Sequence, residues 1–326
     1  MPVHDKDLIW EGATDLRPKI GRLIDILGQV IVGKPEVIQL ALVALVARGH
    51  LLIEDVPGVG KTTLAHALAK TLGCSFQRVQ FTSDLLPSDL LGVSVLNSRT
   101  GEFEFKPGPI FAQIVLADEI NRASPKTQSS LLEAMNDFQI SIDHHTYPLS
   151  RPFMVLATQN PMEHHGTHPL PESQLDRFLL RIRVGYPSPA DERRILSGPR
   201  AQGLIDQCKP VLSIDEVLLL QRAVEMVRVD ESLLDYMLAL IQATRRARGL
   251  TLGASPRGSL ALYRTSQALA FLQGRGYVVP DDVKRVAIPT LAHRVILTGA
   301  WDRTAGLRDE AEEIVRALLD EIPVPR

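Results

Sequence analysis

Between residues 50 and 185, short apolar segments alternate along the chain with longer segments in which apolar residues recur at helical spacing. In residues 61–72, for example, Leu64, Leu68 and Leu72 fall on one face of a helix. This alternation is typical of a mainly parallel sheet covered by helices, and it predicts an α/β fold with five strands. The segments that we expect to form these strands are 51–53, 76–81, 114–117, 153–157 and 179–184.

Two stretches interrupt the alternation and predict insertions in the sheet domain. Residues 82–111 contain strand-like segments at 93–96 and 102–105, set between turn residues. Apolar and polar residues alternate again within residues 138–150, which predicts a hairpin. Long insertions in a packed domain are usually functional loops, and the alternative is that they only decorate the fold.

The pattern changes at residues 185–189, where glycine, proline and serine gather. Every periodic segment after this point has helical spacing, and Ser213 with Glu216 forms a capping-box pattern at the start of one of them. We therefore expect a first domain at 1–187 and a small all-helical second domain at 188–326. The helical segments expected there are 190–196, 214–227, 232–247, 259–272, 281–297 and 307–319.

Composition excludes several classes of protein. The 326 residues include 36 Lys and Arg against 38 Asp and Glu, so the basic excess typical of phosphate-driven nucleic-acid binding is missing. The longest apolar run, 40–47, is far shorter than the roughly 20 residues that span a bilayer. Residues 1–12 lack the pattern of a signal peptide, and Cys74 and Cys208 form no disulfide framework. We expect a cytoplasmic protein that does not cross a membrane.

A glycine-rich segment follows the first expected strand and leads into a helix. Backbone N–H groups and the helix dipole at such a position bind phosphate groups. Lys61 would reach the outer phosphates, and the Thr62 hydroxyl would bind Mg²⁺. The general consensus has glycine where this chain has Asp55. The residues expected to bind the nucleotide here are Val56, Pro57, Gly58, Val59, Gly60, Lys61, Thr62 and Thr63.

Two carboxylates, Asp118 and Glu119, follow the strand expected at 114–117. Asp118 is placed to bind the Mg²⁺ that it would share with Thr62, and Glu119 to orient and deprotonate an attacking water. Asn160 follows the next expected strand, so it would lie at the same edge of the sheet and hold that water or the γ-phosphate. The alternatives are an acidic turn for the carboxylates and a turn residue for Asn160.

Taken together, the motifs resemble the MoxR family of AAA+ ATPases over about residues 30 to 300. The resemblance implies an ATP-binding α/β core, a helical lid and assembly into a ring, typically a hexamer. The residues that carry it are the glycine-rich loop, Leu-Ala-Asp-Glu-Ile-Asn-Arg-Ala at 116–123, Ala-Thr-Gln-Asn-Pro at 157–161, Leu-Pro-Glu-Ser-Gln-Leu-Asp-Arg-Phe at 170–178 and Gly-Ala-Ser-Pro-Arg at 253–257.

The resemblance also implies roles for individual residues. Asn160 matches the first sensor of the family, and Arg257 matches the second, which reaches the nucleotide from the lid. Arg177 matches the arginine finger that acts on the ATP of the neighbouring subunit, and Val32 and Gly33 match the stretch that lines the adenine pocket. Positive charge on the developing phosphate oxygens is worth about 10³–10⁵ in rate when a finger supplies it. The alternative for each arginine is a structural contact, such as a surface ion pair for Arg177.

Other charged clusters carry less weight. Arg122 is a further candidate for a subunit interface. The histidine pairs at 144–145 and 164–165, together with His168, lack the cysteines or paired carboxylates that accompany histidine in metal sites. The arginines at 245–248 lie where a helix is expected to end, and positive charge is favourable there, so a structural role is favoured over nucleic-acid binding.

These features predict a Mg²⁺-dependent ATPase that forms a ring and remodels or activates partner proteins in the manner of a chaperone. The resemblance further implies a partner that carries a von Willebrand factor A domain, besides a client protein. Two alternatives are a helicase-like nucleic-acid motor and the ATPase subunit of a metal chelatase.

Overall fold

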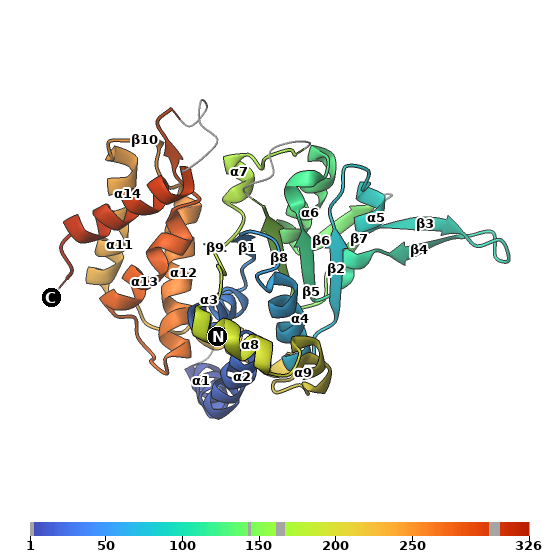
Figure 1. Ribbon diagram of the computed structural model, residues 1–326, viewed down its shortest axis with the longest axis horizontal. Coiled ribbons are helices and arrows are strands. Elements are labelled where there is room, and N and C mark those ends of the chain that lie inside the picture. The colour runs from blue at the N-terminus through green and yellow to red at the C-terminus, as the bar shows by residue number, and fades with distance from the viewer. Residues whose placement is uncertain (1–2, 143–144, 161–166, 300–306, 326) are drawn as a thin grey trace.

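The computed structural model describes residues 3–142, 145–160, 167–299 and 307–325 of the chain. Its centre is the predicted five-stranded parallel sheet, and its strand order is β2-β5-β8-β1-β9 (Figure 1). The strands are β1 (Leu51–Glu54), β2 (Phe76–Gln80), β5 (Ile114–Asp118), β8 (Met154–Gln159) and β9 (Leu180–Ile182).

The two faces of the sheet pack against different sets of helices, which explains why the central strands are apolar throughout. Leu51 and Ile53 of β1 belong to a buried cluster that also contains residues of α2, α3 and α4. Leu52, between them, points to a second cluster on the opposite face, together with Leu131 and Met135 of α6. The helices of this part are α1 (Val3–Asp15), α2 (Arg17–Val30), α3 (Pro35–Val46), α4 (Lys61–Thr71) and α6 (Pro125–Asp137).

Both predicted insertions contain hairpins. The first projects as an arm from the edge of the molecule beside β2, and four of its apolar side chains are exposed: Val93, Val95, Leu96 and Phe103 (Figure 1). The second follows α6, and its turn residues 143–144 lie outside the described residues. The short elements of these regions are α5 (Pro87–Leu91), β3 (Gly92–Leu96), β4 (Phe103–Pro107), η1 (Pro109–Phe111), η2 (Ile120–Arg122), β6 (Gln139–Ile142), β7 (His145–Pro148) and α7 (Glu172–Leu175).

The chain after β9 is helical, as expected, with one exception. The helix expected over 281–297 ends at Leu291, and Ile296 and Leu297 instead form a short antiparallel ribbon with Leu250–Leu252. Short apolar runs fit a helix and a strand equally well, so the pattern could not separate the two. The elements are α8 (Pro189–Ser197), α9 (Ala201–Gln207), α10 (Ile214–Val224), α11 (Glu231–Arg246), β10 (Leu250–Leu252), α12 (Pro256–Leu272), α13 (Pro280–Leu291), β11 (Ile296–Leu297) and α14 (Leu307–Glu321).

The helices after residue 187 pack in two groups. Helices α11 to α14 pack on one another, whereas α9 packs on α2 and α4, and α10 packs on α1 and α3 as well as on α12 (Figure 1). The division near residue 187 therefore stays a prediction. Within the described residues, no helix combines the length and apolar character that crossing a bilayer requires.

A buried arginine joins the last helices to the sheet. The Arg294 side chain is only 2% exposed, and its Nε donates to Asp176 Oδ1 at 2.8 Å. Its other nitrogens donate to backbone carbonyls of residues 176, 178 and 179, just before β9. Burial lowers the pKa of the Arg294 guanidinium to about 10, so the group is still charged at neutral pH. One side chain thus fixes the segment that leads into β9.

Replacing Arg294 with alanine should lower the free energy of unfolding by about 3–5 kcal/mol, because Asp176 and several carbonyls would lose their buried donor. Urea denaturation measures this change. The matched control is Arg194→Ala, which removes an exposed ion pair with Asp191 at 3.1 Å and should cost less than about 1 kcal/mol. Equal losses in the two variants would contradict the structural role given to Arg294.

Candidate active site

The glycine-rich segment forms a loop between β1 and α4. Gly58 and Gly60 have φ of 85° and 97°, in the left-handed region that favours glycine, and Lys61 is the first residue of the helix. The Lys61 ammonium group donates a hydrogen bond to the carbonyl oxygen of Asp55 at 2.7 Å, so its side chain folds back along the loop. Thr62 and Thr63 lie in the first turn of α4. This is the arrangement expected of a loop that surrounds phosphate groups.

Asp55, which replaces the consensus glycine, anchors the loop. Its buried carboxylate accepts hydrogen bonds from three backbone N–H groups: Val56 at 2.8 Å, Val184 at 2.7 Å and Gly185 at 2.6 Å. The last two belong to the segment that follows β9. A glycine here could make none of these bonds, so the departure from the consensus has a structural reason.

Asp118 ends β5 at the same edge of the sheet and is nearly buried. One of its carboxylate oxygens accepts from the Arg78 guanidinium of β2 at 2.6 Å. The other oxygen accepts from the Thr158 hydroxyl of β8 at 2.6 Å. Its direction is therefore set by groups from both neighbouring strands.

Glu119 occupies a left-handed backbone conformation, with φ 57° and ψ 51°, that is unfavourable for any residue other than glycine. Its N–H donates to the Thr158 hydroxyl at 2.8 Å, and its carboxylate accepts from Gln80 at 2.8 Å and from Arg122 at 3.1 Å. Strain of this kind persists only where surrounding contacts hold it, and it is frequent at functional sites. Thr158 links both carboxylate residues.

Asn160 is buried directly after β8, which lies between β5 and β1 in the sheet. Parallel strands end at one edge, so the structure brings the glycine-rich loop, Asp118, Glu119 and Asn160 together there. Val32 and Gly33 lie between α2 and α3. A Cβ atom on Gly33 would come within 2.2 Å of the Asp191 carboxylate, so this stretch lies against the start of α8.

The two predicted arginines flank one polar link between the sheet and α12. Arg177 lies between α7 and β9, and its buried Nε has no hydrogen-bond partner in the described structure. Arg257 is the second residue of α12 and is exposed. This link is a hydrogen bond between residues close to the two arginines in the chain: the Ser255 hydroxyl donates to Asp176 Oδ2 at 2.9 Å.

Three residues of the site were not predicted: Arg78, Gln80 and Thr158. The two residues of β2 reach the carboxylates only because of the strand register, in which Gln80 lies opposite Asp118. Thr158 stands in the Ala-Thr-Gln-Asn-Pro motif, so its position beside Asn160 was the available signal. Arg122 pairs with Glu119 at 3.1 Å, and its place at a subunit interface stays a prediction.

The donors present suit a nucleotide-bound Mg²⁺. This ion keeps several waters and takes only one or two protein ligands besides phosphate oxygens, so the Asp118 carboxylate with the Thr62 hydroxyl meets its need. Among the described residues, no group of three or more His, Cys, Asp and Glu could hold a different metal. His144, His164 and His165 lie outside the described residues.

The Asp55 contacts generate a prediction about stability. In Asp55→Asn, an amide NH₂ group must face backbone N–H donors, so the free energy of unfolding should fall by about 1–3 kcal/mol in urea denaturation. Asp206→Asn is the control, because Asp206 is exposed and its one hydrogen bond within the described residues comes from the Gln202 side chain. That variant should differ from the wild type by less than about 0.5 kcal/mol. An undiminished stability of Asp55→Asn would show that the carboxylate is not an anchor.

Comparison with known proteins agrees with this geometry. Residues 50–180 match the family model described as "ATPase family associated with various cellular activities (AAA)", and residues 242–318 match the AAA lid domain. The chain is 50% identical to the uncharacterized protein YeaC of Bacillus subtilis (strain 168), covering 95% of this chain and 96% of that protein. It is 41% identical to the chaperone MoxR1 of Mycobacterium tuberculosis, covering 91% and 80% of the two chains.

A solved structure supports the same assignment. The crystal structure of a candidate ATPase from Cytophaga hutchinsonii superposes with a TM-score of 0.86 at 39% identity, over 97% of this chain and 98% of that one. The resemblance seen in the motifs is thereby confirmed over nearly the whole length. The chain belongs to the MoxR family of AAA+ ATPases, and it hydrolyses ATP.

Proposed function

We propose that the chain couples Mg²⁺-dependent ATP hydrolysis to the remodelling or activation of partner proteins. The observation that carries this proposal is the convergence of the glycine-rich loop, Asp118 and Glu119 at one edge of the sheet, with Thr158 joining the two carboxylate residues. These are the parts that phosphoryl transfer to water requires: an anion cradle, a metal ligand and a base.

The nucleotide would lie along the N-terminus of α4. Backbone N–H groups of residues 58–63 would bind its phosphates, and Val32 and Gly33 would line the adenine pocket. The Lys61 ammonium group would exchange its hydrogen bond to the Asp55 carbonyl for a phosphate oxygen. Thr62 and Asp118 would hold Mg²⁺, which neutralises charge on the phosphate oxygens when it is bound.

Glu119 would take the proton from the attacking water. The Thr158 hydroxyl accepts from the Glu119 N–H and fixes the backbone from which this side chain extends. Gln80 and Arg122 donate hydrogen bonds to its carboxylate. Asn160 would hold the same water or the γ-phosphate. A positioned general base contributes about 10²–10⁴ to a rate.

The arginines support assembly into a ring, which we propose to be hexameric. Arg257 would reach the nucleotide from the lid, and Arg177 would act as a finger on the ATP of the neighbouring subunit. Arg257 is exposed, and the buried Nε of Arg177 has no hydrogen-bond partner within the described chain. Both observations are consistent with side chains that contact the nucleotide or a neighbouring subunit in the assembled ring. We place the boundary between core and lid near residue 187.

A protein is the favoured target of this cycle. A relative of this chain is named a chaperone, and the near balance of 36 basic and 38 acidic residues gives no general attraction for nucleic acid. We propose a partner with a von Willebrand factor A domain and a protein client. A cytoplasmic location stays a prediction.

The Glu119→Gln variant tests the proposal. Replacing the base with a neutral amide of the same shape should lower ATP turnover by about 10²–10⁴-fold while ATP still binds. Steady-state phosphate release and nucleotide binding measure the two effects, and sedimentation shows whether ATP-loaded rings persist. Glu133→Gln is the matched control, since Glu133 is exposed on α6 away from the carboxyl edge.

Two results would count against the proposal. Unchanged turnover in Glu119→Gln would remove the assignment of the base. Affinity capture with the ATP-loaded variant should retain a protein with the von Willebrand factor A fold, whereas salt-sensitive retention of DNA would favour a nucleic-acid motor.

A further inference from the structure

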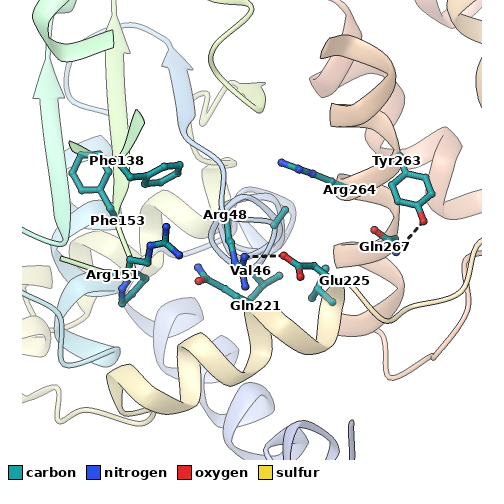
Figure 2. Close-up of a pocket in the computed structure, with 13 residues that line it drawn as sticks. Val46, Arg48, Phe138, Arg151, Phe153, Gln221, Glu225, Tyr263, Arg264 and Gln267 are labelled. Carbon is teal, nitrogen blue, oxygen red and sulfur yellow. Dashed lines mark hydrogen bonds and ion pairs between the residues drawn. The ribbon is translucent and has the colours of Figure 1, made fainter. Parts of the chain in front are cut away.

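A cavity of about 330 Å³ lies at the opposite edge of the sheet from the glycine-rich loop (Figure 2). Arg48 and Phe153, which precede β1 and β8, contribute to its wall, so it opens beside the amino ends of the strands. Helices α10 and α12 line the other side, with Glu225 just after α10 and Arg264 on α12. Its volume falls in the range of about 300–1,000 Å³ typical of small-molecule sites.

The charge of this cavity is unbalanced. Arg48, Arg151 and Arg264 line it with Glu225 as the only carboxylate among its lining residues. Arg48 pairs with Glu225 at 2.8 Å, whereas Arg151 and Arg264 have no carboxylate partner in the described part of the chain. Figure 2 shows these two side chains entering the cavity from opposite sides, with Arg48 between them. Two guanidinium groups therefore face one space without a counter-charge.

Arg48 has an unfavourable backbone conformation. Its N–H bonds to the Leu45 carbonyl, and the N–H of Gly49 bonds to the Ala44 carbonyl, which together form the motif that usually ends a helix with glycine at the Arg48 position. Arg48 adopts φ 56° there, in the left-handed region. A glycine would fit without strain, so the guanidinium needs a reason other than local folding.

The deeper wall of the cavity is apolar. The rings of Phe138 and Phe153 lie with their centroids 6.2 Å apart, and Val224 and Pro152 complete this surface. Behind the rings lies the buried His50, whose pKa is lowered to about 4 by burial, so it is neutral at pH 7. The cavity thus combines an apolar floor with a cationic rim.

We propose that this cavity binds a small organic dianion, with phosphate or carboxylate groups at the two unpaired guanidinium groups and an apolar or aromatic body on the phenylalanine floor. Arginine forks match the geometry of both acidic groups, and a buried apolar wall favours the hydrocarbon part. Arg151 belongs to the sheet domain and Arg264 to α12, so the ligand would bridge these parts. The site is independent of the ATP site and of its proposed chemistry.

Isothermal titration with two probes, benzene-1,4-dicarboxylate and phenyl phosphate, tests the proposal on the full chain. At least one probe should bind with one-to-one stoichiometry. Arg151→Gln and Arg264→Gln should each weaken its affinity about tenfold or more, because a charged hydrogen bond is lost. Which probe binds shows whether the cavity prefers carboxylate or phosphate. The exposed Arg246→Gln on α11 is the control, and it should leave the affinity unchanged.

Two further variants keep the test decisive. Lys61→Ala removes a cation from the glycine-rich loop, so binding at the cavity should persist in it with the same affinity. Arg48→Gly relieves the left-handed strain and should fold at least as well as the wild type, yet bind several-fold more weakly. Failure of both probes to bind up to millimolar concentration would overturn the proposal, as would binding that survives both Arg151→Gln and Arg264→Gln.

Discussion

The geometry of the nucleotide site depends on one buried carboxylate, that of Asp55. A loop built to surround anions must hold its N–H groups outward, and it has few internal bonds with which to do so. Asp55 ties the start of this loop to the N–H groups of Val184 and Gly185 and thereby to the edge strand β9. Three backbone N–H donors satisfy the oxygens of this carboxylate, which offsets the cost of burying it. The loop is therefore positioned by the sheet as well as by its own glycines.

Strand β9 is also the element to which the lid attaches. Arg294 donates hydrogen bonds to the segment that leads into the strand. The hydrogen bond from Ser255 to Asp176 adds a second contact, close to Arg177 and Arg257. At the other end of β9, Arg183, which directly follows the strand, pairs with Asp309 of α14 at 2.6 Å. The glycine-rich loop and the last helices thus contact the same short strand and the segments that flank it.

Much of this arrangement could be predicted because it is local in the chain. Fully buried parallel strands appear as short apolar runs. Asp118 directly follows one such run, and the glycine-rich loop and Asn160 come a few residues after two others. Arg78, Gln80 and Thr158 could not be found in this way, since their contacts depend on strand register. The ribbon at Ile296–Leu297 is too short for periodicity to separate strand from helix. The cavity at the amino edge depends on residues 48, 151 and 264, which only tertiary packing brings together.

We expect ATP to bind at the carboxyl edge of the sheet and not in the cavity at the amino edge. Hydrogen–deuterium exchange of the whole chain, with and without a non-hydrolysable ATP analogue and Mg²⁺, tests it directly. The account predicts slower exchange of the amides in residues 58–63 and at Glu119, with those of residues 47–49 and 263–267 unchanged. Slowing confined to residues 47–49 and 263–267, with residues 58–63 unaffected, would contradict it.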